Sequence, residues 1–195
     1  MKKTWTAVAI GFGLALAAGP ALADGELHIY NWGDYTSPDM IKKFETKYNI
    51  KVTLTDYDSN DAMLAKVKAG GSGFDIVVPS SYVIPSMISD GLLAATEPNK
   101  MDNFKNVRPE FVHVYWDDGR HYTVPWQWGT TGISVDTAKY KGDINTWALL
   151  FNTPDELKGK VNVVPEMADV INAVSFYLGK EPCSSDKDTL KQIND

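Results

Sequence analysis

The run Phe74-Asp75-Ile76-Val77-Val78-Pro79 decides the fold. Its aliphatic centre shows no alternation with polar residues, which is typical of a strand that is covered on both faces. Strands of this kind belong to parallel sheets, and consecutive parallel strands need a long crossover connection, usually a helix. We therefore expect strands and helices to alternate in the sequence around this run.

The residues before this run contain two strand-then-helix units. Strands are expected at residues 27–30 and 51–55. One helix should begin at Pro38, capped by Ser37, and a second should be capped by Asn60 and end before Gly70. The first helix carries an apolar face at helical spacing, made of Met40, Ile41, Phe44 and Tyr48. A third helix follows at residues 83–91, and this order predicts an α/β fold with a parallel sheet and right-handed crossovers.

The second half of the sequence shows a weaker pattern. Beyond the polar residues 99–120, strands are expected at 122–126, 132–135 and 161–164, and helices at 147–151, 169–178 and 187–194. We interpret residues 24–130 as a first α/β lobe and residues 131–195 as the start of a second. A second lobe with so few strands cannot bury a core, so we expect this sequence to be truncated.

The first residues have the pattern of a cleavable signal peptide. Lys2 and Lys3 precede an apolar run at residues 8–18, and Ala21-Leu22-Ala23 supplies a small-x-small cleavage site. The apolar run is too short to anchor the chain in a bilayer. We expect residues 1–23 to be removed on export.

Charge and cysteine content limit the classes of ligand and partner that the sequence favours. The chain has 19 basic and 25 acidic residues, a net charge of −6, and Lys2 and Lys3 lie in the segment expected to be removed. This balance disfavours nucleic acid and anionic membranes as partners and mildly favours cationic ligands. Cys183 is the one cysteine, so no disulfide can form within this sequence. We expect a monomer.

Three loops are candidates for a ligand site. In open α/β sheets, ligands bind beyond the carboxyl ends of the strands. Residues 31–35 and 80–82 follow first-lobe strands, and residues 166–169 follow the expected second-lobe strand. Together they bring aromatic rings and carboxylates, which suit an organic cation because aromatic faces attract cations by ~0.5–2 kcal/mol and carboxylates pair with ammonium groups.

Each candidate also has a purely structural interpretation. Trp32 and Tyr35 could close one end of the lobe, and Ser80 could cap a helix. Glu166 and Asp169 flank a helix start, where acidic residues are favoured in any case. The motif Pro125-Trp126-Gln127-Trp128 is better explained by packing at a lobe junction than by ligand contact.

No set of residues predicts catalysis, a metal or a cofactor. His28, His113 and His121 follow no metal-ligand spacing, and Ser80 lacks the flanking glycines of a nucleophile elbow. The acidic residues Asp56, Asp58 and Asp61 lack the glycine and terminal glutamate of an EF-hand loop. We expect a binding protein rather than an enzyme, with no cofactor.

Several motifs resemble the spermidine/putrescine-binding branch of the type II periplasmic binding proteins. They are Tyr30-Asn31-Trp32-Gly33-Asp34-Tyr35, Asp58-Ser59-Asn60, Phe74-Asp75-Ile76-Val77-Val78-Pro79-Ser80, Pro125-Trp126-Gln127-Trp128-Gly129-Thr130-Thr131-Gly132 and Tyr177-Leu178-Gly179. The resemblance implies a two-lobed fold with a hinge that closes on a polyamine. It also implies a periplasmic component of an ABC-type importer that delivers the ligand to an inner-membrane permease.

The resemblance assigns roles to individual residues. It implies that Trp32 and Tyr35 enclose the polyamine, that Ser80 is a polar contact and that Tyr82 is the aromatic of spermidine-type members. It implies that Asp169 and Glu166 pair with ligand amines, with Asp34 as a secondary candidate beside the site. Gly33 departs from the Ser or Thr that members usually carry, and members are longer than this sequence by roughly as many residues as a second lobe needs.

Two alternatives stay open at this point. The same fold could bind another organic cation, a sugar or chelated iron, which the remaining carboxylates and tyrosines of the site would distinguish. A thiaminase-like enzyme would use a cysteine nucleophile, and Cys183 lies in a polar turn far from the expected cleft.

Overall fold

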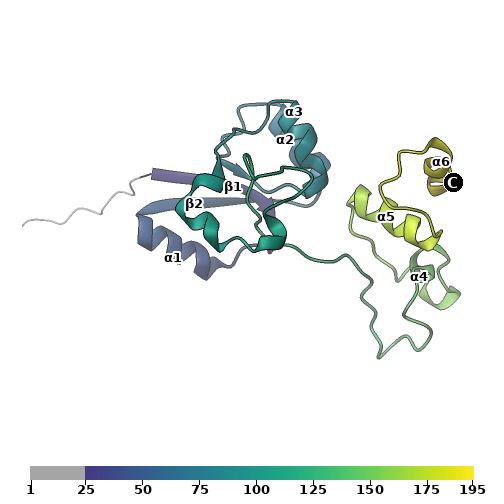
Figure 1. The fold of residues 1–195 in the computed structure, drawn as a ribbon. Coiled ribbons are helices and arrows are strands. Elements are labelled where there is room, and N and C mark those ends of the chain that lie inside the picture. The colour runs from purple at the N-terminus through teal and green to yellow at the C-terminus, as the bar shows by residue number, and fades with distance from the viewer. Residues whose placement is uncertain (1–24) are drawn as a thin grey trace, which may run out of the picture.

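A computed structural model describes residues 25–195 (Figure 1). The expected signal peptide, residues 1–23, lies outside the described residues. Along the described chain, strands and helices alternate as far as α3, and only helices and turns follow.

The sheet has three parallel strands in the order β2-β1-β3, as the sequence predicts. Strand β1 (Gly25–Trp32) lies in the middle and pairs with β2 (Ile50–Tyr57) along its whole length. On its other side it pairs with β3 (Ile76–Val77) through Ile29 and Tyr30. Because all three strands are parallel, their carboxyl ends meet at one edge of the sheet.

Strand β3 is shorter than the expected strand at residues 74–79. Hydrogen bonds beside it prolong the contact with β1, because the Asp75 N–H donates to the His28 carbonyl and the Val78 N–H donates to the Tyr30 carbonyl. The Asp75 carboxylate also accepts a hydrogen bond from the His28 N–H at 2.8 Å. The run therefore holds to β1 beyond the two residues that form the strand.

Helix α1 (Pro38–Tyr48) lies on one side of the sheet. Ser37 is at the cap position, but its carbonyl accepts the N–H groups of Met40 and Ile41 and its side chain makes no capping bond. The expected apolar face is present, yet no residue of α1 is buried and Phe44 remains exposed. The prediction of this helix is confirmed, and the burial of its apolar face within the described residues is not.

The core of the fold lies on the opposite side of the sheet. Helices α2 (Asn60–Lys68) and α3 (Ile84–Ser89) contribute Met63 and Met87, whose side chains are fully buried. They pack with Tyr30, Tyr57 and Val83 in one cluster. Figure 1 shows both helices across the sheet from α1.

The cap of α2 differs from the expectation. Ser59, not Asn60, is the cap residue, and its hydroxyl accepts a hydrogen bond from the Ala62 N–H at 3.2 Å. Asn60 is the first helical residue, so its amide side chain is available for other contacts. The helix ends before Gly70, whose φ of 73° lies in the left-handed region that glycine favours.

None of the three strands expected in the second half forms. The N–H groups of His121, Tyr122 and Thr123 donate to the carboxylate of Asp117 instead of to a neighbouring strand. Residues 132–135 and 161–164 have no strand beside them in the described part of the chain. A strand needs a partner for its backbone groups, and alternation of apolar residues does not supply one.

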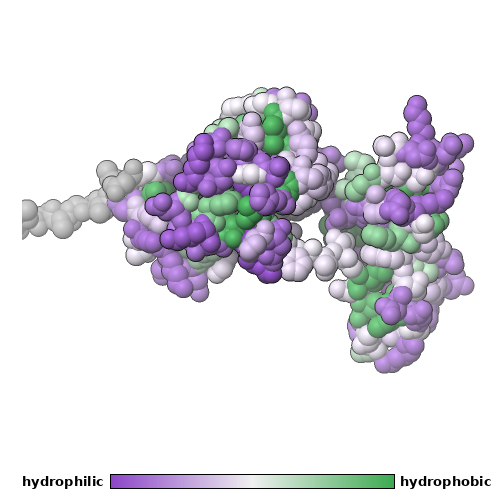
Figure 2. Space-filling view, in the orientation of Figure 1, coloured by the Kyte–Doolittle hydropathy of each residue, from purple (hydrophilic) through white to green (hydrophobic). Residues whose placement is uncertain are grey.

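Three α-helices, with short 3-10 turns between α3 and α5, lie in the remaining part of the described chain. They are α4 (Ala148–Phe151), α5 (Met167–Tyr177) and α6 (Lys187–Asn194), and α6 has the predicted bounds. A long connection leads to them from the sheet-bearing part, and the two parts touch at their facing edges (Figure 2). Among residues 25–195, none of the helices combines the length and apolar character needed to cross a bilayer.

Candidate functional site

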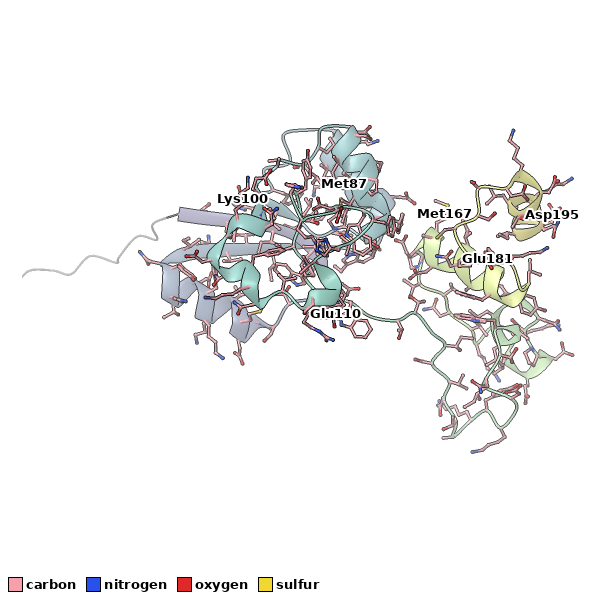
Figure 3. The ribbon with its side chains drawn as sticks, viewed as in Figure 1. Met87, Lys100, Glu110, Met167, Glu181 and Asp195 are labelled. Carbon is pink, nitrogen blue, oxygen red and sulfur yellow. The ribbon has the colours of Figure 1, made fainter. Side chains whose placement is uncertain are left out.

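The candidate site lies where the carboxyl ends of the strands face the first turn of α5. Figure 3 labels Met167 at this end of α5, which points toward the sheet-bearing part. The loops after β1, β2 and β3 begin at Gly33, Asp58 and Val78. The topology therefore brings segments distant in sequence to one place.

A chain of aromatic contacts leads from the core to the loop after β1. The ring of Tyr57 lies 4.8 Å from that of Tyr30, and the ring of Trp32 lies 4.6 Å from that of Tyr57. Tyr35 continues the chain, with its ring 6.1 Å from that of Trp32 and 40% of its surface exposed. Trp32 is thus packed on the core side and is followed by an exposed ring at the edge of the site.

The loop after β1 is held by Asn31, which is buried. Its side-chain oxygen accepts the Trp32 N–H at 2.8 Å, and its amide donates to the Thr36 hydroxyl at 3.1 Å. Between them, Asp34 adopts a φ of 60° and is exposed, with no hydrogen bond or ion pair in the described part of the chain. A Cβ on Gly33 would meet no atom within 4 Å, so this position has room for a larger side chain.

Asn60 connects the loop after β3 with α5. Its side-chain nitrogen lies 3.0 Å from the Ser80 hydroxyl oxygen, 3.1 Å from the Tyr82 hydroxyl oxygen and 3.2 Å from Oε2 of Glu166. Its side-chain oxygen accepts the Ser80 N–H at 3.0 Å. Ser80, Tyr82 and Glu166, three of the predicted site residues, therefore meet at one amide.

The hydroxyl of Tyr82 is anchored while its ring stays accessible. The hydroxyl donates a hydrogen bond to Oε1 of Glu166, and the residue remains 45% exposed. Burial of the hydroxyl raises the pKa of Tyr82 above the ordinary tyrosine value, and the hydrogen bond to Glu166 raises it further. The exposed surface of Tyr82 is thus available to a ligand that the hydroxyl does not contact.

Helix-start preference alone does not explain Glu166. The residue occupies the cap position of α5, but its side chain makes no capping bond. Its Oε2 instead accepts the backbone N–H of Asn60, at 3.1 Å, at the amino end of α2, and the residue is 5% exposed. This carboxylate therefore serves a contact between the two parts of the chain.

Asp169 lies in different surroundings, three residues further along α5. Its Oδ2 accepts a hydrogen bond from the Thr131 hydroxyl at 3.1 Å. It also lines a cavity of about 320 Å³, whose other lining residues are Thr130, Thr131, Trp147, Asn172, Ala173 and Phe176. A carboxylate beside two aromatic residues is a suitable environment for an ammonium group.

Two residues of this arrangement are not predicted by the sequence patterns. The pattern around Asn60 predicts only a helix cap, although the residue follows β2 at the same edge of the sheet as the loops after β1 and β3. Trp147 was expected only as part of a helix, and it lies beside Asp169 in the cavity. The topological rule could have found Asn60, but no periodicity in the sequence points to Trp147.

Residues of the tryptophan motif take two different positions. The indole N–H of Trp126 donates to the Tyr35 carbonyl at 3.3 Å, so Trp126 packs at the exit of the sheet-bearing part. Trp128 is exposed, with its ring 6.4 Å from that of Phe111. Cys183 is exposed in the turn between α5 and α6, and its thiol lies 3.8 Å from the side-chain oxygen of Asn172.

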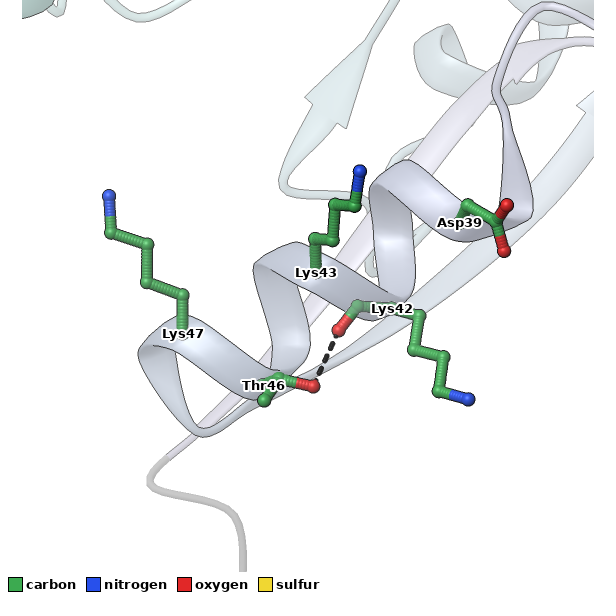
Figure 4. A pocket seen from close by; sticks show the side chains of 5 residues that line it. All are labelled: Asp39, Lys42, Lys43, Thr46 and Lys47. Carbon is green, nitrogen blue, oxygen red and sulfur yellow. Dashed lines mark hydrogen bonds between the residues drawn. The ribbon is translucent and has the colours of Figure 1, made fainter.

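A second hollow, of about 370 Å³, lies along α1 (Figure 4). All of its lining residues belong to this one helix: Asp39, Lys42, Lys43, Thr46 and Lys47. Its three lysines would repel a cationic ligand. In the described part of the chain, no group of three or more histidine, cysteine or acidic residues could hold a metal ion.

Comparison with known proteins gives consistent results. Residues 39–192 match a family described as bacterial extracellular solute-binding protein. The putrescine-binding periplasmic protein SpuD of Pseudomonas aeruginosa is 33% identical, with 95% of this chain and 54% of the relative covered. The spermidine/putrescine-binding periplasmic protein of Escherichia coli is also 33% identical, with 92% and 52% covered.

Solved structures support the fold assignment. The Tp0655 (TpPotD) lipoprotein of Treponema pallidum superposes with a TM-score of 0.75 at 31% identity, covering 86% of this chain and 52% of its own. The substrate-binding protein PotD of Streptococcus pneumoniae gives a TM-score of 0.64 at 31% identity, covering 87% and 52%. The chain thus spans about half the length of these relatives. The fold is that of the type II periplasmic binding proteins, and the chain belongs to the bacterial extracellular solute-binding protein family.

Proposed function

We propose that the protein captures a polyamine such as putrescine or spermidine and delivers it to an ABC-type importer. The observation that carries this proposal is the arrangement at the start of α5. Glu166 and Asp169 are one helical turn apart. Glu166 accepts a hydrogen bond from Tyr82, and the loops after β1 and β3, which we call the loop cluster, expose the aromatic rings of Tyr35 and Tyr82. Carboxylates and aromatic rings from two parts of the chain therefore flank one region.

The chemistry of this region matches that of a polyamine. Each methylene that leaves water against a ring contributes roughly 0.8 kcal/mol. Each ammonium gains ~0.5–2 kcal/mol over an aromatic face and forms a charge-assisted hydrogen bond with a carboxylate. The rings of Trp32, Tyr35 and Tyr82 would take the methylenes and one ammonium, and Asp169 would pair with another.

The relatives support a polyamine over the alternative ligands. SpuD is named for putrescine, and the Escherichia coli protein for spermidine and putrescine. A neutral sugar could donate hydrogen bonds to Asp169 but has no charge to pair with it. The only tyrosine–tyrosine ring contact among the described residues, Tyr30–Tyr57, is buried in the core, which disfavours a tyrosine-pair iron site. Cys183, the residue a thiaminase-like enzyme would need, contacts Asn172, which lines the Asp169 cavity, so the cysteine lies closer to this region than the sequence suggests. The names of the relatives, which are all those of binding proteins, disfavour such an enzyme.

The division into two lobes at residues 130/131 is part of the proposal. Trp126 donates to Tyr35 in the sheet-bearing part, and Thr131 donates to Asp169 on α5. Between Trp126 and Thr131 the chain therefore passes from contacts with the sheet-bearing part to contacts with α5, as a hinge segment would. The family, with relatives named as periplasmic proteins, supports export to the periplasm and docking to a permease.

Calorimetry with matched ligands tests the proposal. The protein expressed from its complete gene would be titrated with putrescine, with spermidine and with 1,4-butanediol, which has the carbon chain of putrescine without its charges. We expect both amines to bind and the diol to give no heat of binding. Equal binding of diol and diamine, or no binding of either amine, would overturn the proposal.

A further inference from the structure

Asn60 is a buried polar residue whose bonds reach two other segments of the chain. It is 2% exposed, and both ends of its side-chain amide and its backbone N–H form hydrogen bonds. Its partners lie in the loop after β3 and, 106 residues away in sequence, at the start of α5. A helix cap or a core amide with local partners would not need the second of these contacts.

The contact with α5 is favourable for the charge of Glu166. Oε2 of Glu166 lies 3.1 Å from the backbone nitrogen and 3.2 Å from the side-chain nitrogen of Asn60. Asn60 is the first residue of the nine-residue helix α2, so the carboxylate also faces the positive end of the helix dipole. The Tyr82 hydroxyl completes three donors around this one side chain.

We propose that Asn60 is a positioning residue that clasps the two parts of the protein together. By holding Glu166 against α2 and the loop after β3, it sets the distance between α5 and the sheet. The segment from Trp126 to Thr131 is then the hinge, and the Asn60–Glu166 contact is the point at which closure is fixed.

The clasp is compatible with ligand binding. A carboxylate offers about four lone-pair sites, and the three donors leave one of them for a ligand ammonium. Ligand and clasp can therefore act together, with the clasp orienting the carboxylate that the ammonium meets. This last step rests on the proposed polyamine site, whereas the clasp itself does not.

A charge substitution at Asn60 tests the clasp without ligand. Asn60→Asp keeps the shape of the side chain and places a second carboxylate against Glu166, where two like charges repel. Dyes on Cys183 and on Ser89→Cys, at the end of α3, report the distance between the two parts by energy transfer. At neutral pH we expect this distance to be longer in Asn60→Asp than in the same labelled protein that retains Asn60.

Two rescues separate positioning from general damage. Acidification to about pH 4–5, where one carboxyl of such a pair is protonated, should restore the short distance in Asn60→Asp. Adding Glu166→Gln should restore it at neutral pH, because Asp and Gln can bond with donor and acceptor exchanged. Asp61, Asp169, Tyr57 and Tyr82 are the other titratable groups near the pair, and they are the same in every variant.

Two further variants complete the design. Ser59→Ala, which removes the cap of α2 without touching Glu166, should leave the distance unchanged. Tyr82→Phe removes one uncharged donor and should lower the ratio of closed to open protein by about tenfold, the effect of one hydrogen bond to a charged group. Thermal melts verify that each variant is folded, and Tyr82→Phe keeps the test decisive if Asn60→Asp does not fold.

The outcomes distinguish the clasp from the polyamine proposal. An unchanged distance in Asn60→Asp and in Tyr82→Phe, or a change that Ser59→Ala reproduces, overturns the clasp even if putrescine binds. The expected distance changes without any putrescine binding leave the clasp in place and remove the proposed ligand.

Discussion

Glu166 and Asp169 occupy the same turn of α5 but differ in what surrounds them. Glu166 is 5% exposed and accepts hydrogen bonds from Tyr82 and from both nitrogens of Asn60. Asp169 is partly exposed, accepts one hydrogen bond from Thr131 and lines a cavity. A separation of three residues therefore moves a carboxylate from a contact between the two parts of the chain to an accessible hollow.

This difference indicates that the two carboxylates have different roles. A buried carboxylate with three donors has most of its lone pairs occupied by the protein, and removing it would leave those donors without their acceptor. A carboxylate with one donor keeps lone pairs for a ligand. We therefore expect Asp169 to contribute more to pairing with the ligand ammonium, and Glu166 to contribute more to holding the two parts of the chain in place. The following substitutions test this contrast.

The largest effect is expected for Asp169→Asn. Asn keeps the shape and can still accept the Thr131 hydrogen bond, but it removes the charge that would pair with an ammonium. Binding of putrescine and of spermidine should weaken by ~2–5 kcal/mol, since a buried ammonium loses its partner. Calorimetry measures this loss, and a thermal melt without ligand should change little.

Salt provides a control for the Asp169 prediction. Raising the ionic strength should weaken binding to the unsubstituted protein only modestly, because a closed site is poorly screened. If Asp169→Asn binds both amines like the unsubstituted protein, Asp169 is only a helix-start residue and the contrast with Glu166 is wrong.

Trp32→Ala is expected to have the next largest effect. Losing one desolvated aromatic face costs about 2 kcal/mol, or roughly thirtyfold in polyamine affinity. Trp32→Phe should recover part of the loss, because it restores a ring against Tyr57. Trp128→Ala is a matched control, since Trp128 is exposed and lies outside the loop cluster. Unchanged affinity in Trp32→Ala would make Trp32 a packing residue only.

A smaller effect is expected for Thr131→Val. The substitution keeps the volume but removes the hydroxyl that orients Asp169, and one hydrogen bond of this kind contributes about 1 kcal/mol. Polyamine affinity should fall about fivefold by the same conversion. Thr130→Val makes the same chemical change in the same cavity, where no hydrogen bond to Asp169 is formed, and should leave the affinity unchanged. Equal losses in the two variants would show that the hydroxyl of Thr131 has no special role.

The smallest effect concerns alkaline stability. Burial raises the pKa of Tyr57 and of Tyr82 above the ordinary value of 10.0, so both hydroxyls keep their protons in the folded chain to higher pH than in the unfolded chain. Their contribution is complete below that value and declines above it, because the unfolded chain then releases protons that the folded chain retains. Melting temperatures should therefore fall above about pH 10.

Tyrosine-to-phenylalanine variants check the alkaline prediction. Tyr57→Phe removes the hydroxyl that donates to the Val78 carbonyl, and Tyr82→Phe removes the one that donates to Glu166. Each variant should show a shallower fall in melting temperature above pH 10.0 than the unsubstituted protein. An identical slope in all three proteins would mean that these hydroxyls titrate alike in both states.

The first half of the fold follows from local patterns, and the second half does not. The apolar run at residues 74–79 and the capped helices predicted a parallel sheet because each element carries its own signal. Residues 122–126 look like a strand, but the carboxylate of Asp117 binds the N–H groups of residues 121–123. Such a competition between side chain and strand partner depends on tertiary structure, which periodicity does not contain.

The site shows the same limit of local patterns. Trp32, Ser80, Tyr82 and Glu166 were predicted from their place after strands and from family motifs, and the structure brings the last three of them together. Asn60 joins them, yet its sequence position, just before an apolar helix face, indicates only a cap. Its partners are 20, 22 and 106 residues away, so the role becomes visible only when the loops are in place.

The most direct test of the account is a crystal structure of the protein expressed from its complete gene with putrescine bound. One ammonium should lie within about 6 Å of the ring centre of Trp32. The other should lie about 2.7–2.9 Å from a carboxylate oxygen of Asp169, with Glu166 still bonded to Asn60. Putrescine bound away from both residues, or an Asp169 carboxylate that contacts only Thr131, would contradict the account.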